Sequence, residues 1–232
     1  MTVGSLFAGI GGLDLGLERA GHRVLWQVES NAFCRRILAQ HWPDIPCYSD
    51  VKKLTGTNLE PVDLLCGGFP CQPVSHAGKQ KGTDDDRWLW PDFARLLRVL
   101  RPRYALLENV PGLLTANGGG AFRDILTDLA ECGYSATWQD LPAASVGAPH
   151  LRYRIFLVAY PDDESQSGCS IYADAGESLS EFARCHQWDK RTPDMDRMAH
   201  GIPHRMDRLR ALGNAVVPQV AEWIGRRLND AS

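Results

Sequence analysis

The sequence has 232 residues, of which 44% are hydrophobic and 23% are charged, and its formal net charge is −3. This length and composition predict one globular core with room for a small appended lobe, and they exclude a disordered, collagenous or repeat protein. The apolar stretches are too interrupted for a signal peptide or a transmembrane segment, so we expect a cytoplasmic protein. Seven cysteines without a C-x-x-C pair predict reduced thiols rather than disulfides.

Short apolar runs alternate with amphipathic segments along most of the chain, a pattern typical of a parallel α/β sheet. We expect strands at 3–7, 24–28, 62–66, 104–107, 138–141 and 155–159. We expect helices at 13–20, 32–41, 91–100 and 122–132. Gly21 would end the first of these helices, Pro43 the second and Gly133 the last. After residue 160 the chain turns polar with little periodicity, and helical spacing resumes at about Met206 with an interruption at Pro218. The chain therefore divides into 1–160, 161–205 and 206–232.

Two basic stretches are candidate phosphate contacts. One contains Arg95, Arg98, Arg101 and Arg103 without an acid among them, and the other spans 186–210. The first spacing also fits the solvent-facing side of a helix, and we favour that interpretation. Basic stretches alone therefore do not decide the function.

A glycine-rich turn follows the first predicted strand, and an acid ends the second. Glycines at 9, 11 and 12 allow a tight turn and close approach of a ligand to the backbone, and Glu29 can accept hydrogen bonds from both hydroxyls of a ribose. The dinucleotide fingerprint fails because Asp14 occupies its last glycine position. No phosphate-binding lysine is present in this turn, so a nucleoside without phosphates fits better.

Two further strand ends carry reactive side chains. Cys71 lies in the turn Gly-Gly-Phe-Pro-Cys-Gln-Pro, where two prolines hold one thiol on a stiff loop. Such a thiol can act as a nucleophile if its surroundings favour the thiolate. Glu108 ends a strand at the sheet edge where ligands bind, and a carboxyl kept protonated in a dry site can donate a proton to a ring nitrogen. We expect both residues, with Gly9 and Glu29, to converge at one edge.

Taken in order, these segments resemble the motif set of the DNA (cytosine-5) methyltransferases, in a compact bacterial or phage form. The matching segments are 5–12, Glu29, Asp50, 68–73, 108–110, 152–154 and 213–216. The resemblance covers nearly the whole chain. It implies a Rossmann-like α/β fold that depends on S-adenosylmethionine, with a small, mostly irregular second lobe. Residues 1–160 would then be the catalytic and cofactor-binding domain, 161–205 a short target-recognition region, and 206–232 a segment that returns to the catalytic domain.

The resemblance also implies a reaction, the transfer of a methyl group to carbon 5 of cytosine in double-stranded DNA, with S-adenosylhomocysteine as the product. In this family a cysteine thiolate adds to carbon 6, and Cys71 matches that position. A protonated carboxyl at Glu108 would neutralise the charge on ring nitrogen 3. Arg152 and Arg154 match the positions that hold the target nucleotide after it has been flipped out of the duplex.

Binding residues follow from the same resemblance. Glu29 would hold the ribose of the cofactor, Asp50 its adenine amino group, and Phe7 its adenine ring or an adjacent face. The other residues expected at the cofactor are Gly9, Gly11, Gly12, Pro70 and Asn214. The residues expected at DNA are Gln72, Ser75, Lys79, Lys81, Arg87, Arg191 and Arg205. The loop 75–82, with glycines and lysines, resembles the mobile loop that closes over DNA.

The chain departs from the family pattern at three places. Ser5 stands where Asp is frequent, and His150 where Gln is usual. The region 161–205 is also much shorter than usual, which predicts a short recognition sequence, or a partner that supplies recognition. The basic residues that would contact phosphates and base edges there are Arg184, Lys190, Arg191, Arg197 and Arg205.

Several alternatives stay open. They are a catalytically silent DNA-binding relative, a tRNA cytosine methyltransferase and a nicotinamide-dependent dehydrogenase, and the last leaves Cys71 and Glu108 without a role. We expect no metal site, because Cys169, Cys185 and His186 lack paired ligand spacing. The expected partner is double-stranded DNA, with a cognate restriction endonuclease as a candidate second partner, and we expect a nucleoid-associated monomer.

Overall fold

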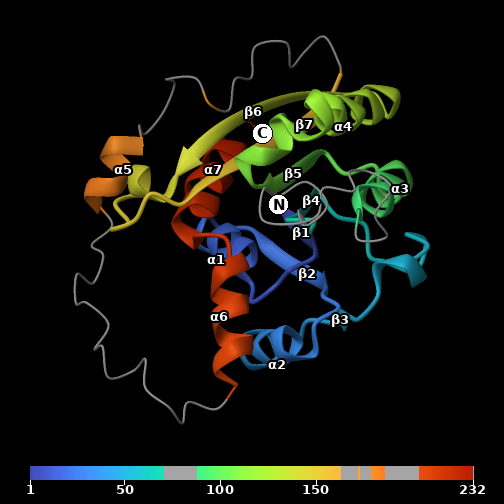
Figure 1. Cartoon of the computed structure of the whole chain (residues 1–232). Coiled ribbons are helices and arrows are strands. Elements are labelled where there is room, and N and C mark those ends of the chain that lie inside the picture. The colour runs from blue at the N-terminus through green and yellow to red at the C-terminus, as the bar shows by residue number, and fades with distance from the viewer. Residues whose placement is uncertain (71–87, 163–171, 173–178, 186–203, 232) are drawn as a thin grey trace.

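A computed structural model describes residues 1–70, 88–162, 172 and 179–231 of the chain, except for 186–203. Within these residues, strands form one seven-stranded sheet in the order β3-β2-β1-β4-β5-β7-β6, with helices packed on both of its faces (Figure 1). The strands are β1 (Thr2–Leu6), β2 (Arg23–Val28), β3 (Cys47–Tyr48), β4 (Leu64–Gly67), β5 (Tyr104–Asn109), β6 (Tyr134–Pro142) and β7 (Tyr153–Pro161). The longer helices are α1 (Gly12–Arg19), α2 (Ala32–His41), α3 (Trp90–Leu100), α4 (Gly120–Glu131), α6 (Arg205–Asn214) and α7 (Pro218–Asp230).

The direction of one strand differs from the prediction. Strands β3, β2, β1, β4 and β5 are parallel, as expected, but β7 lies antiparallel between β5 and β6. Residues of β7 are buried on both faces of the sheet, so its sequence carries the continuous apolar run that parallel strands also have. The pattern therefore predicted a strand correctly and its direction wrongly.

Alternate strand residues supply two hydrophobic cores, one on each face of the sheet. Tyr104 and Leu106 of β5 face the core that α1 and α7 cover, while Ala105 and Leu107 face the core that α3 and α4 cover. This alternation follows from the two-residue period of a strand. The sheet is thus the middle layer of an α/β sandwich, and the predicted α/β class is confirmed.

Local signals explain where the helices begin and end. The Asn31 side chain accepts hydrogen bonds from the backbone N–H groups of Phe33 and Cys34 at 2.8 and 3.2 Å and so caps the start of α2. Helix α1 stops before Gly21, whose φ of 90° lies in the left-handed region that glycine adopts most easily. Both helices were predicted within about one residue of their ends.

The end of the chain packs back onto its beginning. Helix α7 lies against α1, where Ala221 and the backbone of Pro218 sit close to Gly16. A further helix, α5 (Leu179–Cys185), lies in the stretch for which little periodicity was expected, and its Phe182 is fully buried. This short helix was not predicted from the sequence. Most of the rest of 161–203 lies outside the described residues.

The first basic stretch belongs to the fold. The Arg95 guanidinium donates to the backbone oxygens of Leu54 and Val51, and Arg98 forms an ion pair with Asp128 at 3.3 Å. The guanidinium of Arg101 donates to the backbone oxygen of Cys132. The structural interpretation of these arginines is therefore confirmed. No helix in the described ranges is both long enough and apolar enough to cross a membrane.

Candidate active site

A cavity of about 520 Å³ opens at the carboxyl ends of the central parallel strands. Its walls come from the loops after β1, β2, β4 and β5, from the N-terminal part of α2, and from α6 with the segment that follows it. Ligand sites of open α/β sheets form at this edge. The predicted convergence is present in part, because Gly9, Glu29 and Glu108 all line this cavity.

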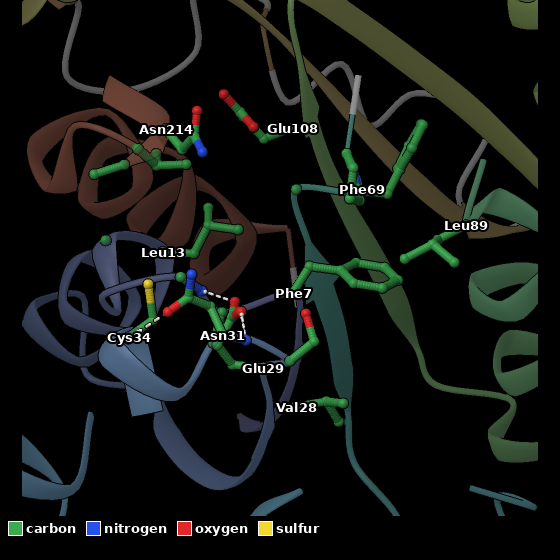
Figure 2. Close-up of a pocket in the computed structure, with 18 of the residues that line it drawn as sticks. Phe7, Leu13, Val28, Glu29, Asn31, Cys34, Phe69, Leu89, Glu108 and Asn214 are labelled. Carbon is green, nitrogen blue, oxygen red and sulfur yellow. Dashed lines mark hydrogen bonds between the residues drawn. The ribbon is translucent and has the colours of Figure 1, made fainter. Parts of the chain in front are cut away.

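Glu29 fixes the glycine turn through its carboxylate. Its Oε2 accepts a hydrogen bond from the Gly9 backbone N–H at 2.7 Å, and its Oε1 accepts one from the Asn31 N–H at 2.7 Å (Figure 2). Each carboxylate oxygen keeps a further lone pair for a ligand hydroxyl. A Cβ built on Gly9 would meet no atom within 4 Å, so the cavity gives a ligand direct access to this backbone.

Phe7 forms part of the apolar wall of the cavity. It adopts a φ of 54°, which is unusual for a residue with a large side chain and costs of order 1 kcal/mol. Its ring lies beside Leu89 in the cavity (Figure 2). Strain of this kind persists where surrounding structure enforces it, and such residues cluster at binding sites.

Asp50 lies on the same rim. It caps the short helix η1 (Val51–Lys53), and its Oδ1 accepts from the Lys52 N–H at 3.0 Å. Val51, which follows it, is buried and also lines the cavity. An acid next to a buried apolar side chain suits the amino edge and the face of a purine ring.

Glu108 is the buried acid at the far side of the cavity. Burial raises its pKa to about 7, although the positive charges of Arg154 and Arg152 act in the opposite direction. Arg154 Nε lies 3.0 Å from Glu108 Oε1, at ion-pair distance. This oxygen is itself buried. The carboxyl can therefore hold a proton near neutral pH.

Two neighbours set the position of Glu108. A Cβ at Gly68 would lie only 2.7 Å from Glu108 Oε2, so only glycine leaves room for the carboxyl there. Next to it, Asn109 donates from Nδ2 to the Phe69 backbone oxygen at 3.2 Å and accepts from the Val110 N–H at 2.9 Å. Asn109 thus ties the end of β5 to the turn that leads through Pro70 to residue 71.

The two predicted arginines occupy different places. Arg154 lines the cavity beside Glu108. Arg152 instead donates from Nη2 to the backbone oxygens of Gly213 and Ala215, at 2.7 and 2.9 Å. It therefore joins the start of β7 to the segment that carries Asn214.

The remaining predicted residues divide into three groups. Those that also line the cavity are Phe7, Gly12, Asp50, Pro70 and Asn214. Gly11 precedes α1 as its N-cap and is not among the lining residues. The residues outside the described part of the chain are Cys71, Gln72, Ser75, Lys79, Lys81, Arg87, Lys190, Arg191, Arg197, Cys169 and His186. Arg205 begins α6, and Arg184 forms an ion pair with Glu181 in α5. His150 lies in the loop that precedes β7.

The sequence interpretation missed several lining residues. Asn31 and Cys34 belong to the start of α2, and Asp207 and Arg210 belong to α6. The i, i+3, i+4, i+7 spacing of Asp207, Arg210, Ala211 and Asn214 is a helical signal that could have grouped them with the predicted Asn214. No cluster of metal-ligating side chains occurs among the residues that the structure describes.

Comparison with known proteins agrees with this arrangement. The family model for C-5 cytosine-specific DNA methylase matches residues 1–200. The chain is 41% identical over 160 residues to the Type II methyltransferase M.NgoMIV of Neisseria gonorrhoeae, covering 67% of this chain and 50% of that protein. It is 31% identical over 217 residues to M.DsaV of Dactylococcopsis salina, covering 90% of this chain and 60% of that protein. The chain thus spans about half the length of such relatives.

The fold agrees as well. The crystal structure of a Spodoptera frugiperda DNMT2 variant superposes with a TM-score of 0.58, at 22% identity, over 71% of this chain and 51% of that one. The Rossmann-like methyltransferase fold predicted from the motifs is therefore confirmed. Motif order, fold and family model agree, and the chain belongs to the C-5 cytosine-specific DNA methylase family.

Proposed function

We propose that this chain transfers a methyl group from S-adenosylmethionine to carbon 5 of cytosine in double-stranded DNA. The observation that carries the proposal is Glu108, a buried carboxyl with a pKa of about 7 that shares one cavity with the Glu29-bound glycine turn. One side of this cavity suits a nucleoside, and the other holds a proton donor next to Pro70, which immediately precedes Cys71.

The cavity suits S-adenosylmethionine in size and in chemistry. Its volume of about 520 Å³ falls in the range of roughly 300–1,000 Å³ that is usual for small-molecule sites. Glu29 would accept hydrogen bonds from the ribose hydroxyls, Asp50 from the adenine amino group, and Phe7 would pack on the ring. Gly9, Gly11 and Gly12 would form the turn beneath the ligand, with Pro70 and Asn214 at its edges. When bound, S-adenosylmethionine supplies the electrophilic methyl group.

The protein side chains would activate the cytosine. The Cys71 thiolate would add to carbon 6, and Glu108 would deliver its proton to ring nitrogen 3, which neutralises the developing charge and leaves an electron-rich carbon 5. After methylation, loss of the carbon 5 proton and expulsion of the thiolate would release the product. Arg154 would hold the flipped base beside Glu108, and Arg152 would keep the 213–215 segment in place against β7.

The DNA contacts are proposed from the motifs. The target base must leave the stack, at a cost of a few kcal/mol that contacts to the duplex offset. Those contacts would come from Gln72, Ser75, Lys79, Lys81, Arg87, Arg191 and Arg205. The short region 161–205 would read a short sequence, or a partner protein would read it. We expect a monomer, with a restriction endonuclease of the same specificity as a candidate companion.

Transfer of tritiated methyl groups tests the proposal. Purified protein is incubated with S-adenosylmethionine and, separately, duplex DNA or tRNA. We expect label in duplex DNA, none with Cys71→Ser, and normal labelling with the matched control Cys47→Ser, because Cys47 lies in β3 outside the cavity lining.

Each other outcome has a definite meaning. Label in tRNA alone would support the RNA methyltransferase alternative. Binding of S-adenosylhomocysteine without transfer to either substrate would indicate a silent relative. Full activity of Cys71→Ser would overturn the covalent mechanism.

A further inference from the structure

Helix α6 turns one charged face toward the cavity. Its lining residues Asp207, Arg210, Ala211 and Asn214 recur at the spacing of a single helical face. Of these, Ala211 is buried, and the polar three lie at the mouth of the cavity. On the rest of the helix, Met206, Leu209 and Leu212 are exposed. The charges that meet the cavity from α6 are therefore one acid and one base, a single turn apart.

The start of α6 is held against the start of α2, which fixes the acid of this pair near the cavity. The rings of Phe33 and His204 are in contact, with centroids 6.0 Å apart, and His204 Nδ1 lies 3.7 Å from Asp207 Oδ2. Cys34 lines the cavity, and the charge of Asp207 interacts with its thiol. Burial is the main cause that raises the pKa of Cys34 to about 11, and the charges of Glu29 and Asp207 add to it. The Asp207 carboxylate is therefore close enough to the cavity to interact with a group inside it.

The cavity has an apolar wall on one side. Figure 2 shows Phe7, Val28 and Leu89 on that side, Leu13, Cys34 and Asn214 on the opposite side, and Glu29 between them. A nucleoside that places its ring on the apolar side and its ribose at Glu29 directs its 5′ substituent away from that side. In S-adenosylmethionine this substituent ends in an α-amino acid, which carries an ammonium group and a carboxylate on one carbon.

We propose that Asp207 and Arg210 form the subsite for this α-amino-acid end. The Asp207 carboxylate would accept from the ammonium group, and the Arg210 guanidinium would donate to the carboxylate. Opposite charges one helical turn apart match a zwitterion, and α6 would then select a donor that has its complete amino-acid end. This inference rests on the proposed function, because it assumes that the cavity takes S-adenosylmethionine.

Binding of truncated ligands to the full chain tests the subsite. Isothermal titration calorimetry would compare S-adenosylhomocysteine with 5′-methylthioadenosine, which lacks the amino acid, and with decarboxylated S-adenosylhomocysteine. Wild-type protein should bind S-adenosylhomocysteine at least about tenfold more tightly than 5′-methylthioadenosine. Arg210→Gln and Asp207→Asn should each weaken S-adenosylhomocysteine binding about five- to tenfold and leave 5′-methylthioadenosine unchanged.

The two residues can be separated with the decarboxylated ligand. Arg210→Gln should not affect its binding, because the group that Arg210 contacts is missing, whereas Asp207→Asn should weaken it. The matched control is Arg208→Gln, which replaces an arginine of the same helix that does not line the cavity. This control should bind all three ligands as the wild type does. Unchanged binding of 5′-methylthioadenosine also shows that each variant is folded.

The contrary outcomes differ from those that would overturn the proposed function. If the wild type binds none of the three ligands, both proposals are wrong. If it binds them but Arg210→Gln and Asp207→Asn keep the wild-type preference, the subsite is wrong and the proposed function stands. If Arg208→Gln weakened S-adenosylhomocysteine binding as much as Arg210→Gln does, the subsite would also be wrong, because the net charge of α6 would then act at long range.

Discussion

Two buried carboxyl groups near the same sheet edge behave differently. Asp14 in α1 is fully buried, and burial raises its pKa to about 6 even though Ser5 Oγ and Gln27 Nε2 donate to it at 3.1 and 2.7 Å. Glu108 in β5 is 7% exposed and lies beside Arg154, and its pKa is raised to about 7. Both acids are thus shifted by desolvation.

The difference lies in what each carboxyl faces. Asp14 uses both oxygens within the protein, where it ties α1 to β1 and β2 behind the glycine turn. Glu108 lines the cavity, and its Oε1 lies 3.0 Å from Arg154 Nε. A raised pKa alone therefore does not identify a catalytic acid, whereas a raised pKa on a group that lines a cavity marks a candidate.

The largest expected effect comes from Glu108→Gln. Glutamine keeps the shape but cannot deliver a proton at ring nitrogen 3, so methyl transfer to duplex DNA should fall about 10²- to 10⁴-fold. Binding of S-adenosylhomocysteine should change little, because Glu108 lies across the cavity from Glu29. Initial rates and calorimetry measure the two quantities. A rate within a factor of about two of wild type would show that Glu108 is structural in the same sense as Asp14.

Gly68→Ala should have the next largest effect. The new Cβ would lie 2.7 Å from Glu108 Oε2, so the carboxyl must move away from its present position. We expect a loss in the rate of transfer of about 10- to 100-fold, with a melting temperature within a few degrees of wild type. Gly120→Ala is a matched control, because a Cβ there would lie 3.7 Å from its nearest neighbour and Gly120 does not line the cavity. Wild-type rates for Gly68→Ala would mean that the exact carboxyl position does not matter.

Asp14→Ala should act on stability instead. It leaves Ser5 and Gln27 with buried polar groups that have lost their partner, which should lower the free energy of unfolding by about 1–3 kcal/mol. Chemical denaturation measures this loss. The protein that remains folded should still methylate DNA. If the rate fell as far as with Glu108→Gln while stability stayed unchanged, the proposed division of roles would be wrong.

A further expected effect is a pH dependence of stability. A carboxyl whose pKa is higher in the folded than in the unfolded state binds more protons when folded, so stability falls as the pH rises between the two values. For Asp14 this window runs from a pKa of 3.8 to about 6, and for Glu108 from 4.5 to about 7. The difference in unfolding free energy between Asp14→Asn and wild type should therefore change from about pH 4 to pH 6 and be constant above about pH 7. A constant difference throughout would mean that Asp14 has an ordinary pKa.

Most of the parallel half of the sheet was predictable because its signals are local. Asn31 and Pro43 bracket α2, and an acid at the end of an apolar run marks the strand ends at Glu29 and Glu108. The direction of β7 was not predictable, because a strand buried on both faces carries no directional pattern. The short β3 pairs through only two residues, too few for a periodic signal.

The site was predictable where a single short motif contains both the turn after a strand and the functional side chain. Glu29 and Glu108 were placed correctly at strand ends, and the structure brings both to the same cavity. In the sequence, Asp14 showed only that the dinucleotide fingerprint fails. Its structural role was not predictable, because its partners Ser5 and Gln27 come from separate strands. The role of Asn109 depends on a contact between distant segments, which spacing along the chain does not reveal. The charged residues of α6 are different, because their helical spacing could have grouped them with Asn214.

The bonds from Arg152 to Gly213 and Ala215 span 61 and 63 residues, and Val216 closes over Gly12 from a segment near the other end of the sequence. The cavity is therefore assembled from segments that lie far apart in the sequence. A nascent chain on the ribosome can pair its strands early, yet the wall of this cavity is complete only after α6 and the residues that follow it have emerged. Premature termination before that point would yield the sheet without the complete cavity.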